Sequence, residues 1–146
     1  MNATYTSNEA KTELNHIKIE IINTSKTKRK NLQIQNSTLN SSDISNMELV
    51  NAKLNNVSLK YGTFRMCNVE NSEFTSINLT SSIFENVIFR DSTFIDVDFY
   101  DSQFTKVMFL NCTFRDCNFQ TTALDTDVTC ANCSFKGLSR LTDTNL

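Results

Sequence analysis

The sequence predicts a solenoid, a chain that winds around one axis and turns a corner every five residues. Every fifth residue from Ile34 to Leu124 is apolar, nineteen times without exception. Ten of the eleven phenylalanines fall on these positions. With 39% of residues apolar, nineteen chance matches have odds on the order of one in 10⁸. A period of five fits neither the 3.6 residues of a helical turn nor the alternation of a strand, so the chain must turn repeatedly.

The residue two places before each of these core positions is also restricted. These minus-two positions carry no charge and are nearly all small, and from Ser82 to Val107 serine and valine alternate strictly. Each five-residue unit therefore directs one large and one small side chain inward. We expect the inward serines to donate hydrogen bonds to the backbone of the turns, because an unpaired buried hydroxyl is costly.

Units such as Ser92-Thr93-Phe94-Ile95-Asp96 and Cys112-Thr113-Phe114-Arg115-Asp116 carry a family resemblance. The chain resembles the pentapeptide-repeat family, whose motif is summarised as A-(D/N)-L-x-x. The resemblance implies an all-β fold, a right-handed quadrilateral β-helix of about five coils with short terminal caps. It places four repeats in each coil, so residues twenty apart should stack. The implied structural core contains ten rings: Phe64, Phe74, Phe84, Phe89, Phe94, Phe99, Phe104, Phe109, Phe114 and Phe119.

The register divides the chain into three parts. We expect residues 1–31 to form an N-terminal tail or cap, 32–124 the pentapeptide-repeat β-helix, and 125–146 a last partial coil with a C-terminal cap. The basic run Lys26-Thr27-Lys28-Arg29-Lys30 is interpreted as a solvated loop. After Leu124 the pattern slips by one residue, which would turn Val128, Cys130, Cys133, Phe135 and Leu138 inward.

The sequence offers no recognisable catalyst. It lacks a Ser/His/acid set, a glycine-rich phosphate loop and clustered metal ligands, so we expect no enzyme activity, cofactor or metal site. The Cys130–Cys133 pair has the spacing of a C-x-x-C motif, for which a metal or redox role stays open. Packing is the favoured interpretation of all five cysteines, because the register places them at inward positions.

A first candidate partner surface is apolar. Ile88 and Met108 should stack at outward positions, and Leu110 should lie beside Met108 on the same face. Outward apolar groups of this kind suit a protein-docking patch or a dimer contact, although scattered surface hydrophobes are also common. The favoured function is a non-enzymatic protein–protein interaction module.

A second candidate surface is acidic. Its members are Asp91, Asp96, Asp98 and Asp101 within one coil, with Asp116 stacked over Asp96. The family resemblance implies one use for them, since some members imitate duplex DNA and bind type II topoisomerases. A DNA-mimicking topoisomerase inhibitor is therefore the alternative function. Arg90, Lys106 and Arg115 interrupt the acidic surface, and a soluble charged face explains it equally well.

The expected partner is a protein of unknown identity, with a homodimer through an end cap as a further possibility. We expect no direct nucleic-acid binding and no membrane span, because no apolar run approaches the ~18 residues that a span needs. A cytoplasmic location is expected. The string Phe109-Leu110-Asn111-Cys112-Thr113-Phe114 resembles the luminal domain of SV2 synaptic-vesicle glycoproteins, and the polar N-terminal residues resemble a secreted effector. A luminal or secreted domain that presents a strand edge therefore stays open as well.

Overall fold

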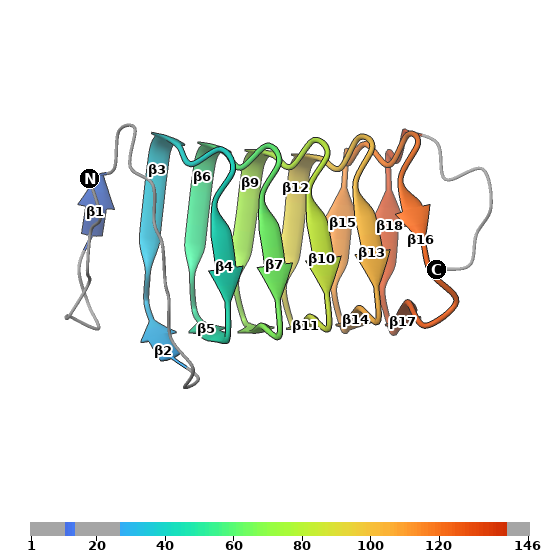
Figure 1. The fold of residues 1–146 in the computed structure, drawn as a ribbon, viewed down its shortest axis with the longest axis horizontal. Helices are drawn as coiled ribbons and strands as arrows, with labels where there is room; N and C mark the ends of the chain where they lie inside the picture. The colour runs from blue at the N-terminus through green and yellow to red at the C-terminus, as the bar shows by residue number, and fades with distance from the viewer. Residues whose placement is uncertain (1–10, 14–26, 140–146) are drawn as a thin grey trace.

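The computed structural model describes residues 11–13 and 27–139, and every regular element in those ranges is a β-strand. The strands stack in coils along one long axis, with β1 at one end and β18 near the other (Figure 1). Within the described ranges, no helix has the length and apolarity needed to cross a membrane. The predicted β-solenoid of about five turns, built from parallel sheets, is confirmed.

Three parallel sheets form three faces of the solenoid, and we name each after one of its strands. The β9 sheet contains β1 (Lys11–Glu13), β3 (Gln33–Thr38), β6 (Lys53–Ser58), β9 (Glu73–Asn78), β12 (Thr93–Asp98), β15 (Thr113–Arg115) and β18 (Ser134–Lys136). The β10 sheet contains β4 (Asp43–Ser45), β7 (Thr63–Arg65), β10 (Ile83–Glu85), β13 (Gln103–Thr105) and β16 (Ala123–Leu124). The β11 sheet contains β2 (Thr27–Lys30), β5 (Met47–Val50), β8 (Asn68–Glu70), β11 (Ile88–Arg90), β14 (Met108–Leu110) and β17 (Thr129–Ala131).

The fourth face follows the six-residue strands of the β9 sheet around a corner. Its coils are joined by further backbone bonds, such as Leu59 N–H to the Asn78 oxygen at 2.7 Å and Phe99 N–H to the Asn118 oxygen at 2.8 Å. These bonds link each coil to the next as the sheets do on the other faces. The cross-section is therefore four-sided, as the family resemblance implies.

Corners recur every five residues because one residue in each unit adopts a left-handed backbone. In the part of the chain that the structure describes, twenty non-glycine residues, each two places after a core position, have φ between 49° and 59°. Most are Asn, Asp or Ser, which tolerate this region better than other residues. The asparagines also bond along the rod: Asn71 donates to Asn51 at 2.6 Å, and Asn51 donates to Asn31 at 3.2 Å. The same residues thus turn the chain and tie adjacent coils together.

The predicted phenylalanine stacks are present inside the solenoid. Phe64, Phe84 and Phe104 stack with ring centroids 4.7 Å apart at each step, nearly parallel. The other three columns repeat this arrangement: Phe74–Phe94–Phe114–Phe135, Phe89–Phe109 and Phe99–Phe119. Burying one such side chain contributes about 1.5–3 kcal/mol, so these columns supply a large part of the folding free energy.

The minus-two serines bond to backbone as expected. Ser102 donates to the Leu79 carbonyl oxygen at 2.7 Å, and Ser82 donates to that of Leu59 at 3.0 Å. Ser92 accepts a bond from the Ser72 N–H at 3.2 Å. Among the described residues, no buried side-chain nitrogen or oxygen lacks a partner. The serines are therefore structural.

The one-residue slip after Leu124 is confirmed. Phe109 pairs with Cys130 and Phe114 with Phe135, so the repeat distance is 21 residues where the earlier coils use 20. Val128 is buried, while Cys130, Cys133 and Leu138 are half-buried against the core. Phe135 stacks on Phe114 and stays 36% exposed, because it belongs to the final described coil.

The interpretation of the basic run as a loop was wrong. Thr27–Lys30 is strand β2, which pairs in parallel with β5 and sets Arg29 opposite Leu49. Arg29 therefore stands at a core position of the β11 sheet, twenty residues before Leu49. The five-residue register therefore continues into β2, although Arg29 is charged where the later coils carry an apolar residue. Most of the predicted N-terminal part, residues 1–31, lies outside the described residues, and the proposed three-part division stays a prediction.

Candidate functional site

The outward apolar residues form one patch on the β11 sheet. Ile88 of β11 and Met108 of β14 are paired across the two strands, and Leu110 lies two residues beyond Met108 on the same face. Met108 is 37% exposed, whereas Ile88 and Leu110 are half-buried. We call these three residues the β14 patch. The structure brings them together as the sequence predicted.

The alternation of the strand explains why these side chains face outward. Phe109 and Phe89 point into the solenoid, so the residues on either side of each must point out. Polar neighbours border the patch, with Asn68 and Glu70 of β8 on one side and Thr129 of β17 on the other. The exposed Arg90 pairs with Leu110 within it. An apolar centre with a polar border is typical of a protein-docking surface.

The backbone beneath the β14 patch is fixed on both sides. Met108 N–H donates to the Val87 oxygen at 3.0 Å, and Thr129 N–H donates to the Val107 oxygen at 2.9 Å. Asp91 N–H donates to the Leu110 oxygen at 2.9 Å. A surface held in this way loses little conformational entropy when a partner binds.

Other exposed apolar residues lie apart from this patch. Ile83 belongs to the β10 sheet, and Tyr100 follows Phe99 on the fourth face. Tyr61 and Met66, which sequence reasoning missed, are 60% and 52% exposed at left-handed corners. Their signal in the sequence was a bulky side chain at a position that elsewhere is mostly Asn, Asp or Ser.

The acidic candidates occupy several different corners of the solenoid. Asp91, Asp96, Asp101 and Asp116 each have a left-handed backbone, and Asp98 lies at the end of β12. Asp116 stands one coil beyond Asp96, as predicted, because β12 and β15 pair in register. The five carboxylates thus surround the coil and do not form one stripe along it.

Most of these carboxylates accept hydrogen bonds from neighbouring coils. Asp91 accepts from the Asn111 amide at 3.0 Å, and Asp96 accepts from the Ser76 hydroxyl at 2.8 Å. Asp98 and Asp101 take part in equivalent contacts with Asn118 and Ser81. Asp116 lies 3.8 Å from Arg115, a surface pair of small energetic value. These contacts give the acidic residues a structural role at the corners.

The cysteines are positioned for packing. Cys117 donates to the Phe94 oxygen at 3.5 Å, and Cys112 donates to the Phe89 oxygen at 3.5 Å. Burial raises the pKa of both thiols to about 11, so both are protonated at neutral pH.

The C-x-x-C pair lies at the end of the core. Burial is the main cause that raises the pKa of Cys130, and the neighbouring Cys133 raises it further. Low thiolate content makes a thiol a poor nucleophile. Within the described ranges, no three His, Cys, Asp or Glu side chains are grouped so that they could hold a metal ion.

Comparison with known proteins identifies the repeats. The model of the family described as pentapeptide repeats matches in eight copies, at residues 72–109 and 82–120. No curated protein matches the chain. The matched residues contain the β14 patch and all the acidic candidates.

Several solved structures are similar to parts of the chain. One is trypsin-treated QnrB1, a plasmid-mediated fluoroquinolone resistance protein, at 13% identity and a TM-score of 0.41, covering 70% of this chain and 57% of that one. The pentapeptide repeat protein Rfr23 from the cyanobacterium Cyanothece 51142 has 12% identity and a TM-score of 0.31. The match covers 76% of this chain and 89% of that one. HetL from the cyanobacterium Nostoc is a pentapeptide repeat protein involved in heterocyst differentiation regulation. It has 8% identity and a TM-score of 0.33, and the match covers 80% of this chain and 86% of that one. This chain thus spans little more than half of the QnrB1 structure.

Proposed function

We propose that this chain, a pentapeptide-repeat protein, is a non-enzymatic interaction module that docks a protein partner through the β14 patch. The observation that carries the proposal is the pairing of two outward apolar side chains, the half-buried Ile88 and the 37% exposed Met108, on an outer face that is mostly polar. Ile88 and Met108 stand where the preceding coils place Glu48 and Asn68. Apolar groups at such outward positions contribute nothing to the core, and their exposure to water disfavours the unbound state.

The position of the patch within the rod supports the same proposal. Strands β11 and β14 are interior strands of the sheet, with β8 and β17 on either side. A partner that docks there contacts side chains and does not need to extend the sheet. We therefore expect a partner with an apolar surface of its own, bordered by polar groups.

The test replaces the apolar centre with charge. Met108→Glu/Leu110→Glu should remove partner binding in a quantitative affinity pull-down, because two carboxylates cannot be buried unpaired at an interface. The matched control is Gln103→Glu/Thr105→Glu, which alters the two outward residues of β13 in the same coil. Equal retention of partners by both double variants would contradict the assignment of the β14 patch.

The alternative, DNA mimicry toward a type II topoisomerase, remains a separate hypothesis. It rests on the exposed carboxylates at Asp91, Asp96, Asp101 and Asp116. A gyrase supercoiling assay with the protein in stoichiometric excess distinguishes the two. Inhibition that Asp96→Asn/Asp116→Asn abolishes would favour mimicry, whereas no inhibition by the wild type would exclude it.

A further inference from the structure

The last described coil carries two cysteines at one corner. Cys130 is the core residue of β17, and Cys133 is the minus-two residue that precedes β18. Asn132, which lies between them, has the left-handed backbone of a corner, with φ of 53°. The two cysteines are therefore the first and fourth residues of one tight turn. The chain has five cysteines, and only these two share a corner in this way.

The geometry of this corner brings the two sulfur atoms together. The Cα atoms of the first and fourth residues of such a turn lie within about 7 Å of each other, and a disulfide needs roughly 4.4–6.8 Å. Both side chains pack against the core, and a side-chain hydrogen bond joins Cys130 to Cys133. Rotation about the side-chain bonds is therefore sufficient to bring the sulfurs into bonding distance.

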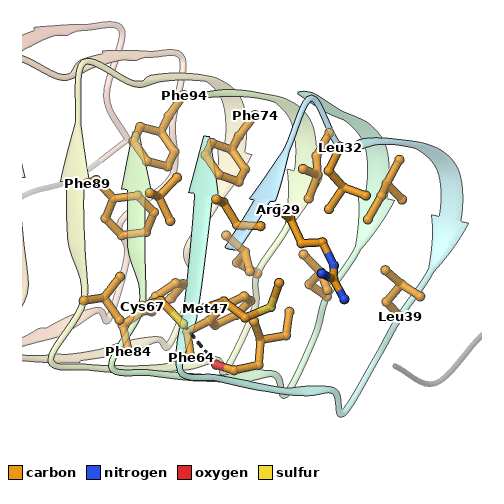
Figure 2. A pocket seen from close by; sticks show the side chains of 18 residues that line it. Arg29, Leu32, Leu39, Met47, Phe64, Cys67, Phe74, Phe84, Phe89 and Phe94 are labelled. Carbon is orange, nitrogen blue, oxygen red and sulfur yellow. Dashed lines mark hydrogen bonds between the residues drawn. The ribbon is translucent and has the colours of Figure 1, made fainter. Parts of the chain in front are cut away.

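The same two thiols are the accessible ones. Cys130 and Cys133 are half-buried, and the other three thiols are buried. Figure 2 shows one of those three, Cys67, beside the apolar cavity of the early coils, where it donates to the Ile44 carbonyl oxygen at 3.3 Å. The corner pair belongs to the final described coil, where Phe135 is also 36% exposed. A small reagent in solution therefore reaches this pair most easily.

Cys112 is the third thiol nearby, one coil before Cys133. Its thiol donates to the Phe89 carbonyl oxygen at 3.5 Å, and the Cys133 thiol donates to that of Phe109, also at 3.5 Å. Each of these two sulfurs thus points toward the coil before its own, so the two are parallel and do not face each other. Cys130 is the thiol that faces Cys133 across the corner.

We propose that Cys130 and Cys133 are a site of disulfide formation by exchange with a low-molecular-weight disulfide, and that the new bond fastens the last described coil. One thiolate attacks a sulfur of the small disulfide, whose S–S bond breaks and releases one small thiol. The second cysteine then attacks its neighbour's sulfur in the mixed disulfide and releases the other small thiol. The chain loses two electrons and two protons, and the small disulfide gains them as it becomes two thiols.

Burial affects the rate of this exchange. It raises the pKa of the Cys130 thiol, and the neighbouring Cys133 raises it further. Because the thiolate is the attacking species, the exchange should be slow at neutral pH and faster at alkaline pH. The pair therefore suits a slowly formed link and not a fast redox catalyst.

The bond ties β17 to β18 at the corner between them. Each strand is held to the preceding coil: Thr129 N–H donates to the Val107 oxygen at 2.9 Å, and Ser134 N–H donates to the Cys112 oxygen at 3.0 Å. Among the described strands, neither has a neighbour on its other side. Strands with one neighbour open most readily, because fewer contacts hold them. A covalent link across the corner should slow that opening.

The experiment treats the full chain at about pH 8.5 with hydroxyethyl disulfide, a small neutral reagent, and counts free thiols after the reagent is removed. We expect the five thiols to fall by two and to be restored by dithiothreitol. Trypsin separates the candidate pairs, because residues 116–136 form one peptide that contains Cys117, Cys130 and Cys133, whereas Cys112 lies in the preceding peptide. Mass spectrometry should find the disulfide within the one peptide, with Cys117 free.

Three results would overturn the proposed site: an unchanged thiol count, small-molecule adducts that persist on Cys130 or Cys133, or a disulfide that includes Cys112. The variant Cys133→Ser should give a mixed disulfide on Cys130 and no internal bond. The matched control Cys117→Ser, at a buried minus-two position, should form the internal bond at the wild-type rate. If either variant does not fold, the wild-type peptide map decides the outcome by itself.

Hydrogen exchange tests whether the bond fastens the coil. In the oxidised chain the Thr129 and Ser134 amides should exchange at least about threefold more slowly than in the reduced chain. The Thr113 amide, which donates to the Ser92 oxygen at 3.0 Å, belongs to an interior strand and should not change. Equal exchange of Thr129 and Ser134 in the two forms would overturn this part of the proposal.

Discussion

The coils that contain residues 34–59 and those that contain residues 84–119 share one backbone and differ in what fills it. The early core positions carry Ile and Leu, whereas the later ones carry Phe without exception. The later rings stack 4.7–5.1 Å apart, and the early coils surround a cavity of about 80 Å³. The corners and the backbone bonds between coils are nonetheless the same in both regions.

This difference separates two functions of the repeat. The left-handed corners and the small minus-two residues fix the path of the chain, since both regions have them. The size of the core residue decides how densely the interior packs. A β-solenoid can therefore keep its register while one region is filled and another is left with space.

The largest loss of stability should come from placing a charge among the phenylalanine columns of residues 84–119, which we call the filled region. Phe94→Asp should prevent folding, because removing the ring costs about 3–5 kcal/mol and the buried carboxylate adds a further penalty. Thr93→Asp, at the adjacent outward position, should be tolerated. Far-UV circular dichroism and gel filtration of both variants check the prediction. Similar behaviour of the two would show that the inward and outward assignment is wrong.

Reciprocal Phe and Leu substitutions in one column should change the free energy of unfolding in opposite directions. Phe94→Leu should lower the free energy of unfolding by about 1–2 kcal/mol, because it opens a cavity in the filled region. Leu54→Phe should raise it by about 1 kcal/mol, since the ring fills space and extends the stack from Phe74. Urea unfolding measures both. A loss of stability in Leu54→Phe would mean that the early coils are already fully packed.

Replacing buried serines should change stability less, and by different amounts in the two regions. Ser102 donates to the Leu79 oxygen at 2.7 Å and accepts from the Ser82 N–H at 3.4 Å, whereas Ser42 donates to the Leu39 oxygen at 2.6 Å. Ser102→Ala should cost about 1–2 kcal/mol, because it leaves buried partners unpaired. Ser42→Ala should cost about 1 kcal/mol. The order of the two urea midpoints is the decisive result.

Alkaline pH should also lower the stability of the filled region. Burial raises the pKa of Cys112 and Cys117 from the ordinary 9.0 to about 11 in the folded protein. The unfolded chain therefore releases these protons first, so their contribution to stability is complete below pH 9 and falls as the pH rises toward 11. Urea midpoints between pH 8 and pH 11 should decline less in Cys112→Ala/Cys117→Ala than in the wild type. Parallel declines would assign the effect to other groups.

The core arrangement could be predicted because each of its rules is local. Phe94 and Phe114 are twenty residues apart, and the period of five stacks them once the family resemblance supplies four repeats in each coil. The slip at Cys130 could be predicted in the same way, since one extra residue shifts every later position. The β14 patch followed from the alternation around Phe109.

Other features depended on contacts that no local pattern reports. Arg29 looked like part of a solvated loop, because its charge hid a core position that only the pairing with β5 reveals. The carboxylates of Asp91 and Asp96 looked like a surface for a partner, and the structure shows them bonded to Asn111 and Ser76 of adjacent coils.

The sequence by itself determined the five-residue register and the residues that point inward, because each unit repeats the same choice of large, small and corner residues. The four faces were implied by the resemblance to the pentapeptide-repeat family. Only the tertiary structure decided how much space those residues leave. Interior volume depends on four side chains from four faces meeting at one level of the rod, and a repeat specifies each of them separately. The cavity beside Arg29 is the result of that sum.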